Sequence, residues 1–360
     1  MRKSISLIII LLASINLFSQ SNLSGKIVDT EPIELYLALT NSIKKKGNPD
    51  ETCLRKYFSN PTVTFFKQRP NFDSLKFINS LIAIYTGKTS ELQDNDKDSD
   101  FDLMLKYKEN ESIIEKGILR VKTADINGMV NKRLKPFYPS DFNIASQSLH
   151  FIYLFLDEGN GGIPGYVFNS ALQTAWLGNE DIDIISAHEA YHSITNSIFL
   201  NKFMHVFEGL PNDTLANSQN LLMYLEIVAE EGIADLIDKD ILSSKNSPLS
   251  KQIKILTQNE QHRAEDKIRQ LDSLLRNDKQ TLNFLDLRNI LENGGHIPGR
   301  YMAKKIKIAN LLNEYISETG NPFKFIYLYN EAVKDQVATP RFSETSISNL
   351  KMLEKKLRGM

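Results

Sequence analysis

Apolar residues recur at every third or fourth position along most of this chain, which is the spacing of amphipathic α-helices. In the first part of the chain the spacing predicts helices at 33–45, 72–85, 101–121 and 124–134, with a proline-containing break at 60–70. Towards the other end it predicts helices at 252–275, 284–291, 299–317, 322–334 and 343–357. No repeat or low-complexity linker separates these segments, so the pattern favours a single unit over two independent domains.

The pattern changes near the middle of the chain, where apolar residues follow one another directly. Residues 149–156 are an aromatic and aliphatic run, and 159–165 contain four glycines and a proline before a second short run at 166–169. This arrangement predicts two strands around a turn. The expected fold class is therefore α+β, predominantly helical, with a small sheet. The sequence leaves open whether this sheet binds an extended ligand at an exposed edge or is a buried structural hairpin.

Two histidines four residues apart, His188 and His192, stand in the sequence His-Glu-Ala-Tyr-His within a segment of helical character. On an α-helix these positions share one face about 6 Å apart, so both imidazoles can bind one Zn²⁺. Glu189 is turned about 100° around the helix, where its carboxylate can reach a water on the metal. Zinc lowers the pKa of such a water to about 7, which lets Glu189 act as general base. The motif predicts a hydrolase with one zinc per chain.

A catalytic zinc has three protein ligands and one open position, so a third ligand is needed. Residues 221–238 are an apolar helical run interrupted by carboxylates, among them Glu230, Glu231 and Asp235. Buried carboxylates are costly unless they are paired or bind a metal. Glu230 and Glu231 are both candidates for the ligand. Only Glu231 has an aspartate four residues later on the same helical face, which favours Glu231.

The His-Glu-x-x-His motif followed by Glu231-x-x-x-Asp235 resembles the gluzincin metallopeptidases, in which a later helix supplies a glutamate ligand and, one turn on, an aspartate. The resemblance implies a zincin-like core in which His188, His192 and Glu231 bind zinc, with the small sheet beside the motif helix. It also implies that Asp235 accepts the far N–H of a ligating histidine. Two features depart from the thermolysin-like pattern, since the interval before Glu231 is longer and Glu230 stands where an asparagine is common.

A third segment, Gly-Gly-His296, resembles the loop of thermolysin-like peptidases in which a histidine stabilises the oxyanion. By that resemblance His296 donates a hydrogen bond to the tetrahedral intermediate, with Tyr301 or Arg300 as alternates. Here His296 follows the glycines without the usual spacer residue. A second interpretation stays open, namely a helix end and turn in which the glycines adopt positive φ and Pro298 begins the next helix.

Composition and the beginning of the chain indicate its setting. Lys and Arg number 43 against 44 Asp and Glu, a net charge of −1, which provides no electrostatic reason to bind nucleic acid or an anionic membrane. A basic start followed by the apolar run 5–18 is typical of a secretory signal peptide, so we expect export to the periplasm or medium. The run is short for a membrane span, so no membrane association is expected after cleavage. Cys53 is the only cysteine, which excludes an intrachain disulfide.

The expected organisation is a signal peptide at 1–20, a helical N-terminal region at 21–148 and a zincin-like metallopeptidase region at 149–360 whose C-terminal part is helical. The chain is expected to be an exported zinc metallopeptidase that acts on a peptide or protein substrate. Two alternatives stay open. A zinc-dependent hydrolase of a non-peptide substrate retains every ligand, and an inactive zinc-stabilised binding protein retains the ligands without needing Glu189. The sequence does not indicate an oligomeric state.

Overall fold

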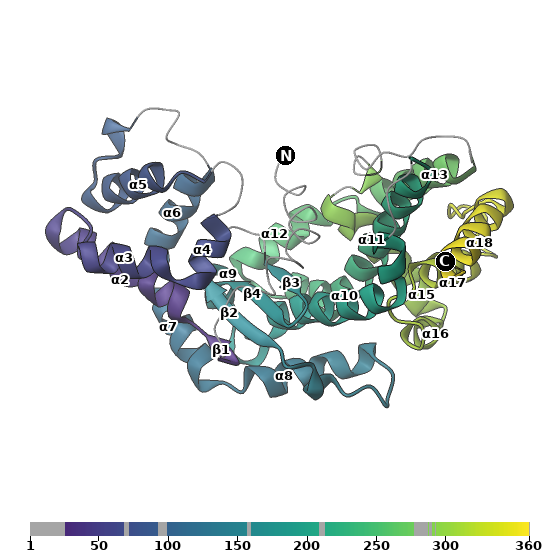
Figure 1. Cartoon of the computed structure of the whole chain (residues 1–360), viewed down its shortest axis with the longest axis horizontal. Coiled ribbons are helices and arrows are strands. Elements are labelled where there is room, and N and C mark those ends of the chain that lie inside the picture. Colours follow the sequence, from purple (N-terminus) through teal and green to yellow (C-terminus); the bar gives the residue numbers. More distant parts are fainter. Residues whose placement is uncertain are drawn as a thin grey trace. The chain divides into compact units, whose positions relative to one another are not determined.

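The computed structural model describes the chain as mainly helical (Figure 1). The residues that it describes are 26–67, 72–92, 99–156, 160–208, 213–276, 287, 290–291 and 293–359. Within them a four-stranded mixed sheet accompanies the helices, which confirms the predicted α+β class. The predicted signal peptide at 1–20 lies outside the described residues.

The chain divides into two compact units. The first unit consists of residues up to Val130 together with Ser148–Glu189, and the second unit consists of Asn131–Gln147 and Ala190–Met360. None of the described helices combines the length and the apolar character that crossing a membrane requires.

The helices of the first unit are α2 (Glu31–Lys46), α3 (Glu51–Ser59), α4 (Pro61–Lys67), α5 (Ser74–Thr86), α6 (Ser99–Glu109), α7 (Glu111–Thr123) and α9 (Ala171–Ala175), while α8 (Ile126–Leu134) begins in this unit and ends in the second. Of these, α2, α5 and α8 agree with the predicted helices at 33–45, 72–85 and 124–134, whereas α3, α4 and α9 were not predicted. The predicted helix at 101–121 is in fact two helices divided at Asn110. Single 3₁₀ turns occur in the chain at Thr89–Glu91, Lys135–Phe137, Ile144–Gln147, Asn179–Asp181 and Asn293–Gly295.

The predicted break at 60–70 is wrong in its first part, because α4 begins there. The side chain of Asn60 accepts hydrogen bonds from the backbone N–H groups of Thr62 at 3.0 Å and Val63 at 3.3 Å. Pro61 follows Asn60 directly, and proline at the first helical position has no N–H to leave unsatisfied. The proline therefore starts a helix at this point instead of interrupting one.

The sheet lies in the first unit and has the order β1-β2-β4-β3. Its strands are β1 (Val28–Asp29), β2 (His150–Leu154), β3 (Gly161–Ile163) and β4 (Tyr166–Ser170). The predicted hairpin between 149–156 and 166–169 is wrong, because β2 and β4 are parallel. The hairpin is instead β3–β4, which turns at Gly165 with φ of +82°. The glycine-rich segment had the composition of a turn, yet its middle residues pair as an edge strand.

The end of β2 packs into an aromatic core. The ring of Phe155 stacks on Tyr36 of α2 at 4.5 Å between centroids and lies 4.6 Å from Tyr107 of α6. The hydroxyl of Tyr107 is 3.3 Å from the carbonyl oxygens of both Leu154 and Leu156, so the backbone that leaves the sheet has a buried hydrogen-bond partner. This core fixes where the parallel strands end.

The sheet contacts the helix that carries the His-Glu-x-x-His motif, α10 (Ile184–Glu208). The hydroxyls of Tyr153 on β2 and Ser186 on α10 are 3.2 Å apart, and Ser186 donates to Asn169 Oδ1 on β4 at 3.0 Å. All three side chains are buried. Two neighbouring strands therefore hold the first turn of the motif helix through one serine.

The rest of the second unit is helical. After α10 come α11 (Asp213–Ser244), α12 (Pro248–Leu256), α13 (Glu260–Arg276), α15 (His296–Ile308), α16 (Leu312–Ile316), α17 (Pro322–Ala332) and α18 (Glu344–Arg358). The predicted helix at 252–275 is divided between α12 and α13, and the one at 299–317 is divided between α15 and α16, where Asn310 has φ of +59°. The predicted helix at 284–291 lies largely outside the described residues.

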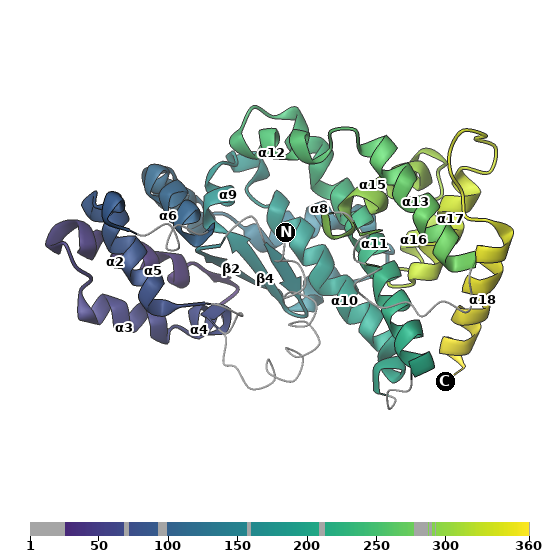
Figure 2. The same cartoon turned by 90° about the horizontal axis from the view of Figure 1, so that it is seen from above.

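Helices α11 and α15 cross at a pair of glycines, and Figure 2 shows the two helices side by side near α13 and α17. A Cβ atom on Gly232 of α11 would lie 2.5 Å from the carbonyl oxygen of Gly299 on α15, and a Cβ on Gly299 would meet the carbonyl of Val228. Only glycine allows the two backbones to approach this closely. The crossing brings the residues around Gly232 next to the first turn of α15.

Candidate metal centre

The motif residues lie on α10, as predicted, and are nearly enclosed. His188 is 4% exposed, and Glu189 and His192 are each 8% exposed. The intervening Ala190 and Tyr191 are fully buried in the core. Because these intervening residues are packed in the core, the two histidines on this helix lie one turn apart with little freedom to move.

Adjacent glutamates on α11 approach opposite nitrogens of His192. Glu230 Oε1 lies 3.1 Å from His192 Nδ1, and Glu231 Oε2 lies 3.4 Å from His192 Nε2. The sequence left these two glutamates as rival ligands. The geometry gives them different positions, since a carboxylate at Nδ1 can orient the ring while a carboxylate near Nε2 can bind the same metal ion as that nitrogen.

His296 is the first residue of α15, and it joins the same group. The preceding glycines have φ of 71° and 101°, so the turn that the sequence left open as a second interpretation does form, although the helix begins two residues before Pro298. His296 Nδ1 lies 3.0 Å from Glu231 Oε2 and 3.1 and 3.2 Å from the two oxygens of Asp235. The acceptor role predicted for Asp235 is therefore directed at His296.

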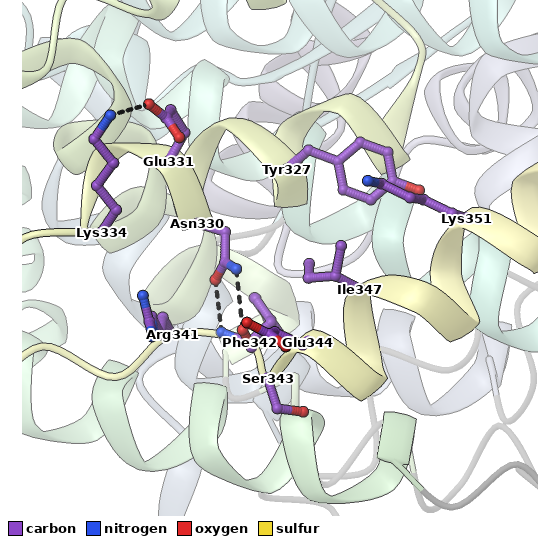
Figure 3. Close-up of a pocket in the computed structure, with 10 residues that line it drawn as sticks. All are labelled: Tyr327, Asn330, Glu331, Lys334, Arg341, Phe342, Ser343, Glu344, Ile347 and Lys351. Carbon is purple, nitrogen blue, oxygen red and sulfur yellow. Dashed lines mark hydrogen bonds and ion pairs between the residues drawn. The ribbon is translucent and has the colours of Figure 1, made fainter.

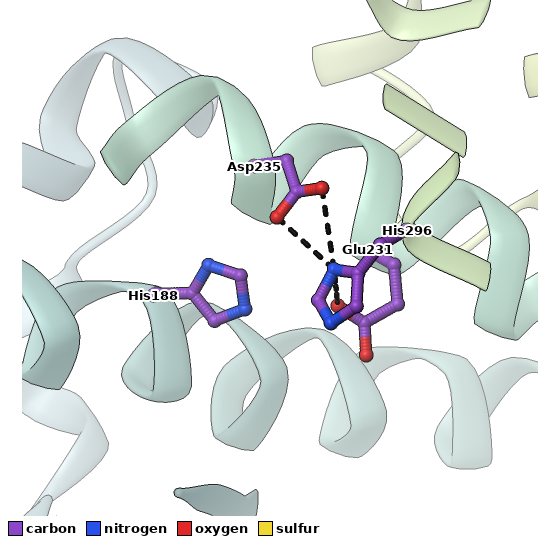
Figure 4. A group of neighbouring side chains, drawn as sticks. All are labelled: His188, Glu231, Asp235 and His296. Carbon is purple, nitrogen blue, oxygen red and sulfur yellow. Dashed lines mark hydrogen bonds and ion pairs between the residues drawn. The ribbon is translucent and has the colours of Figure 1, made fainter. Parts of the chain in front are cut away.

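Four of these side chains form a cluster of metal-ligating groups (Figure 4). One ligand atom from each of His188, Glu231, Asp235 and His296 lies within 4.8 Å of the others. Donors around a tetrahedral zinc with bonds of 2.0–2.1 Å are about 3.3 Å apart. The 3.4 Å between His192 Nε2 and Glu231 Oε2 agrees with this value. The donor set of imidazoles and carboxylates, in this spacing, suits zinc.

Carboxylates control the charge of both α11-facing histidines. Burial opposes protonation of His192, but Glu231 and Glu230 outweigh it and hold its pKa well above the ordinary value. Burial likewise disfavours the charged form of His296, whereas Asp235 and Glu231 raise its pKa. Carboxylates that favour a positive imidazolium also favour a cation in its place, so this is an environment that attracts a metal.

Glu226, to which the sequence assigned no role, lies one turn before Glu230 on α11 and is 3% exposed. Neither of its carboxylate oxygens has a hydrogen-bond partner among the described residues. Burial, and then the neighbouring Glu230, raise the pKa of Glu226 well above its ordinary range. Glu226 therefore favours its neutral acid form, in contrast to the glutamates that face His192.

The two alternates to His296 have other partners. The hydroxyl of Tyr301 donates to Glu265 on α13 at 3.1 Å. Arg300 is buried and pairs with Asp240 at 2.6 Å and Glu260 at 2.9 Å. Neither side chain contacts a predicted zinc ligand in any interaction resolved among the described residues, whereas His296 does.

A separate hollow lies in the second unit between α17 and α18 (Figure 3). Its volume is about 360 Å³, and its walls include Tyr327, Asn330, Arg341 and Lys351. Asn330 ties the backbone of Phe342 through two hydrogen bonds, which shapes one wall. None of the predicted site residues lines this hollow.

Comparison with known proteins agrees with the chemistry of this centre. A family model described as "Putative zinc dependent peptidase (DUF5700)" matches residues 54–337, more than three quarters of the chain. No curated protein and no solved structure gives a significant match. The matched stretch contains the motif helix, the glutamates of α11 and His296. The chain therefore belongs to this family.

Proposed function

We propose that this chain is an exported zinc metallopeptidase in which His188, His192 and Glu231 bind the metal. The observation that carries the assignment is the approach of Glu231 Oε2 to His192 Nε2 at 3.4 Å, the spacing of two donors on one tetrahedral zinc. His188 is one turn before His192 on α10, and its imidazole is within 4.8 Å of Glu231. Three protein ligands leave one coordination position for the reaction.

Glu230 has the role of orienting His192 in this proposal. Its carboxylate lies 3.1 Å from Nδ1 as an ion-pair partner, which places it on the side of the ring away from Nε2 and leaves Nε2 for zinc. Such a partner fixes the tautomer and the ring orientation of a ligating histidine. Thermolysin-like enzymes commonly have an asparagine at this position, so the charged Glu230 makes the ring a more basic ligand.

The remaining residues move protons and bind charge. When bound, zinc supplies a Lewis acid that polarises the scissile carbonyl and lowers the pKa of a nearby water. Glu189 takes the proton of the attacking water and delivers it to the leaving amine. His296, in the protonated form that Asp235 and Glu231 favour, gives its Nδ1–H to Asp235 and its Nε2–H to the oxyanion. Tyr301 remains an alternate whose hydroxyl must first leave Glu265.

Zinc quantification joined to a peptide-library digest tests the proposal. The purified protein is expected to hold one zinc per chain and to cleave peptides, and Glu189→Gln is expected to retain zinc but lose turnover. Unchanged turnover in Glu189→Gln removes the assigned mechanism. Zinc without cleavage of any peptide, in wild type, favours the non-peptide hydrolase or the inactive binding protein over the peptidase.

Substitution of the adjacent glutamates tests the ligand set. Glu231→Ala is expected to lose zinc. Glu230→Ala is expected to lower the affinity for zinc by about 10–100-fold, as loss of an orienting partner typically does. Zinc retained in Glu231→Ala but lost in Glu230→Ala reverses the assignment. Export is tested separately by finding the mature amino terminus near residues 20–22 in protein recovered outside the cytoplasm.

A further inference from the structure

Lys239 lies one helical turn beyond Asp235 on α11, and its ammonium is largely shielded from solvent. Its Nζ lies 2.9 Å from Asp238 Oδ2 and 3.5 Å from Asp235 Oδ1, and 14% of its side-chain surface is exposed. Burial disfavours the charge, but Asp238 and Asp235 outweigh burial and raise the pKa of Lys239. The ammonium is therefore charged, and it directs that charge at the carboxylate that faces His296.

Two carboxylates compete for one N–H of His296. Glu231 Oε2 lies 3.0 Å from Nδ1, and the oxygens of Asp235 lie 3.1 and 3.2 Å from the same nitrogen. The contacts with Asp235 have hydrogen-bond geometry, whereas Glu231 is a close ion-pair partner of the same nitrogen. Which carboxylate receives the N–H decides how the ring is aimed and whether Glu231 is available to a metal.

Lys239 favours one outcome of this competition. Asp235 is 1% exposed, and a carboxylate so deeply buried needs a compensating positive charge. The ammonium of Lys239 supplies that charge from the next turn of α11. The two residues are four positions apart with the acid first, which is the favourable order for an ion pair on one helical face. Asp235 is thereby held in place as the acceptor beside His296.

We propose that Lys239 is a positioning residue that acts on His296 through Asp235. By fixing Asp235 it directs the Nδ1–H of His296 to Asp235, which leaves Glu231 to the metal and the other imidazole nitrogen to the substrate. This inference rests on the proposed function. It adds a residue outside the family resemblance, since neither the motif nor the ligand set requires a lysine on α11.

A neighbouring lysine provides a matched control. Lys304 on α15 lies 3.6 Å from Asp240 and 3.5 Å from Glu260, so it also joins a network of charges between helices of the second unit. Among the described residues, its ion pairs and hydrogen bond go to Asp240 and Glu260 and not to Asp235 or His296. A merely structural ion pair and a positioning lysine can therefore be compared within the same group of helices.

The test compares Lys239→Met, Lys239→Arg and Lys304→Met at saturating zinc. Lys239→Met is expected to lower kcat by about tenfold or more with KM within about twofold of wild type, as loss of a partner behind a functional group does. Lys239→Arg restores most of kcat because it keeps the charge. Lys304→Met leaves kcat unchanged. In a His296→Ala background, Lys239→Met has no further effect on kcat, because the group through which it acts is absent.

Two results overturn the inference. One is an unchanged kcat in Lys239→Met with only a lowered Tm, which indicates a structural ion pair. The other is an equal fall in kcat with and without His296. Nitrogen-15 NMR of the zinc-loaded protein gives a readout that does not depend on turnover. The fraction of His296 that carries a proton on Nδ1 is expected to fall in Lys239→Met and to stay unchanged in Lys304→Met. Failure of the proposed function is recognised separately, by wild type that binds no zinc or by full turnover in Glu189→Gln.

Discussion

Among the described residues, a close crossing of helices made by small residues occurs in each compact unit, and the two crossings have opposite surroundings. In the first unit Gly117 of α7 meets Ala175 of α9, where a Cβ on the glycine would lie 2.9 Å from the Ala175 Cα. Apolar residues of α7 surround this contact, and Arg120 at its margin donates to the carbonyls of Ala175 at 3.0 Å and Leu177 at 2.6 Å. In the second unit Gly232 meets Gly299 within a group of buried ionisable side chains.

The difference separates packing from chemistry. Around Gly117 the charge lies at the edge and satisfies helix carbonyls, which stabilises the fold at little cost. Around Gly232 the charges of Glu231, Asp235, Lys239 and His296 are buried or largely shielded from solvent, and ionised groups in such positions are expensive unless each has a partner. Packing charged side chains at a helix crossing contributes little to the stability of the fold. It does bring ligands from two helices to one point.

Adding a methyl group at each crossing is the strongest test of this comparison. Gly232→Ala forces α11 and α15 apart, because the new Cβ meets backbone that cannot rotate away. We expect a loss of about 1–3 kcal/mol in the free energy of unfolding from overpacking, and displacement of His296 from Glu231. Zinc binding and turnover should therefore fall together, measured by metal content and kcat.

Gly117→Ala is the matched control, since its Cβ also meets backbone. It should lower the Tm by a similar amount while zinc content and kcat of the folded protein stay within about twofold of wild type. The comparison fails if Gly117→Ala removes zinc as completely as Gly232→Ala does, because both crossings would then support the site equally.

His296→Ala tests whether the charged residues at the crossing of Gly232 and Gly299 serve the reaction. If His296 serves the oxyanion, its removal should lower kcat by about 10²–10³-fold while zinc content remains at one per chain. Metal analysis and steady-state kinetics on the same sample provide both values. Loss of zinc from His296→Ala would instead make His296 a ligand, together with the Glu231 and Asp235 that it faces.

The sequence predicted the parts of the site that lie within one helix. His188, Glu189 and His192 depend only on helical spacing, and α10 places them as expected. The preference for Glu231 over Glu230 came from a same-face argument, and Glu231 is the carboxylate that faces His192 Nε2. That assignment, like the other site roles, stays a prediction until metal content is measured.

What the sequence did not predict depends on contacts between elements. The approach of Glu230 to His192 Nδ1 needs the packing of α10 on α11, and the pairing of Asp235 with His296 needs the crossing at Gly232 and Gly299. A glycine inside a helix that also carries the acidic ligands was the available signal for that crossing. The parallel pairing of β2 with β4 was hidden for a similar reason, because alternation within a strand does not specify its neighbour.

The affinity of the site for zinc should depend on pH, whereas the contact between Gly117 and Ala175 in the first unit contains no group that titrates near neutral pH. The pKa of His192 is raised by Glu231 and Glu230, so in the metal-free protein this imidazole carries a proton below that pKa. Zinc must displace the proton, and the affinity should therefore increase about tenfold per pH unit until the raised pKa is passed, then level off. Competition titrations with a chelator of known pH dependence give the slope. A flat profile between pH 6 and 8, roughly the range in which imidazoles titrate, would contradict a protonated His192.

The smallest expected effect concerns Glu226, a buried acid on α11 that belongs to the charged interior but to none of the proposed roles. Its pKa is raised in the folded protein, so the folded state binds the proton more tightly than the unfolded state does. Stability must then fall as the pH rises above the unfolded pKa of about 4.3 towards the folded value. Glu226→Gln removes this dependence and should raise the free energy of unfolding by about 1 kcal/mol at pH 7, with no gain at pH 4.

Glu115→Gln, at an exposed position on α7, should change stability little at either pH. A gain for Glu226→Gln that is equal at both pH values would mean that packing, and not charge, makes Glu226 unfavourable, and α11 would then resemble the first crossing more closely than its neighbours suggest.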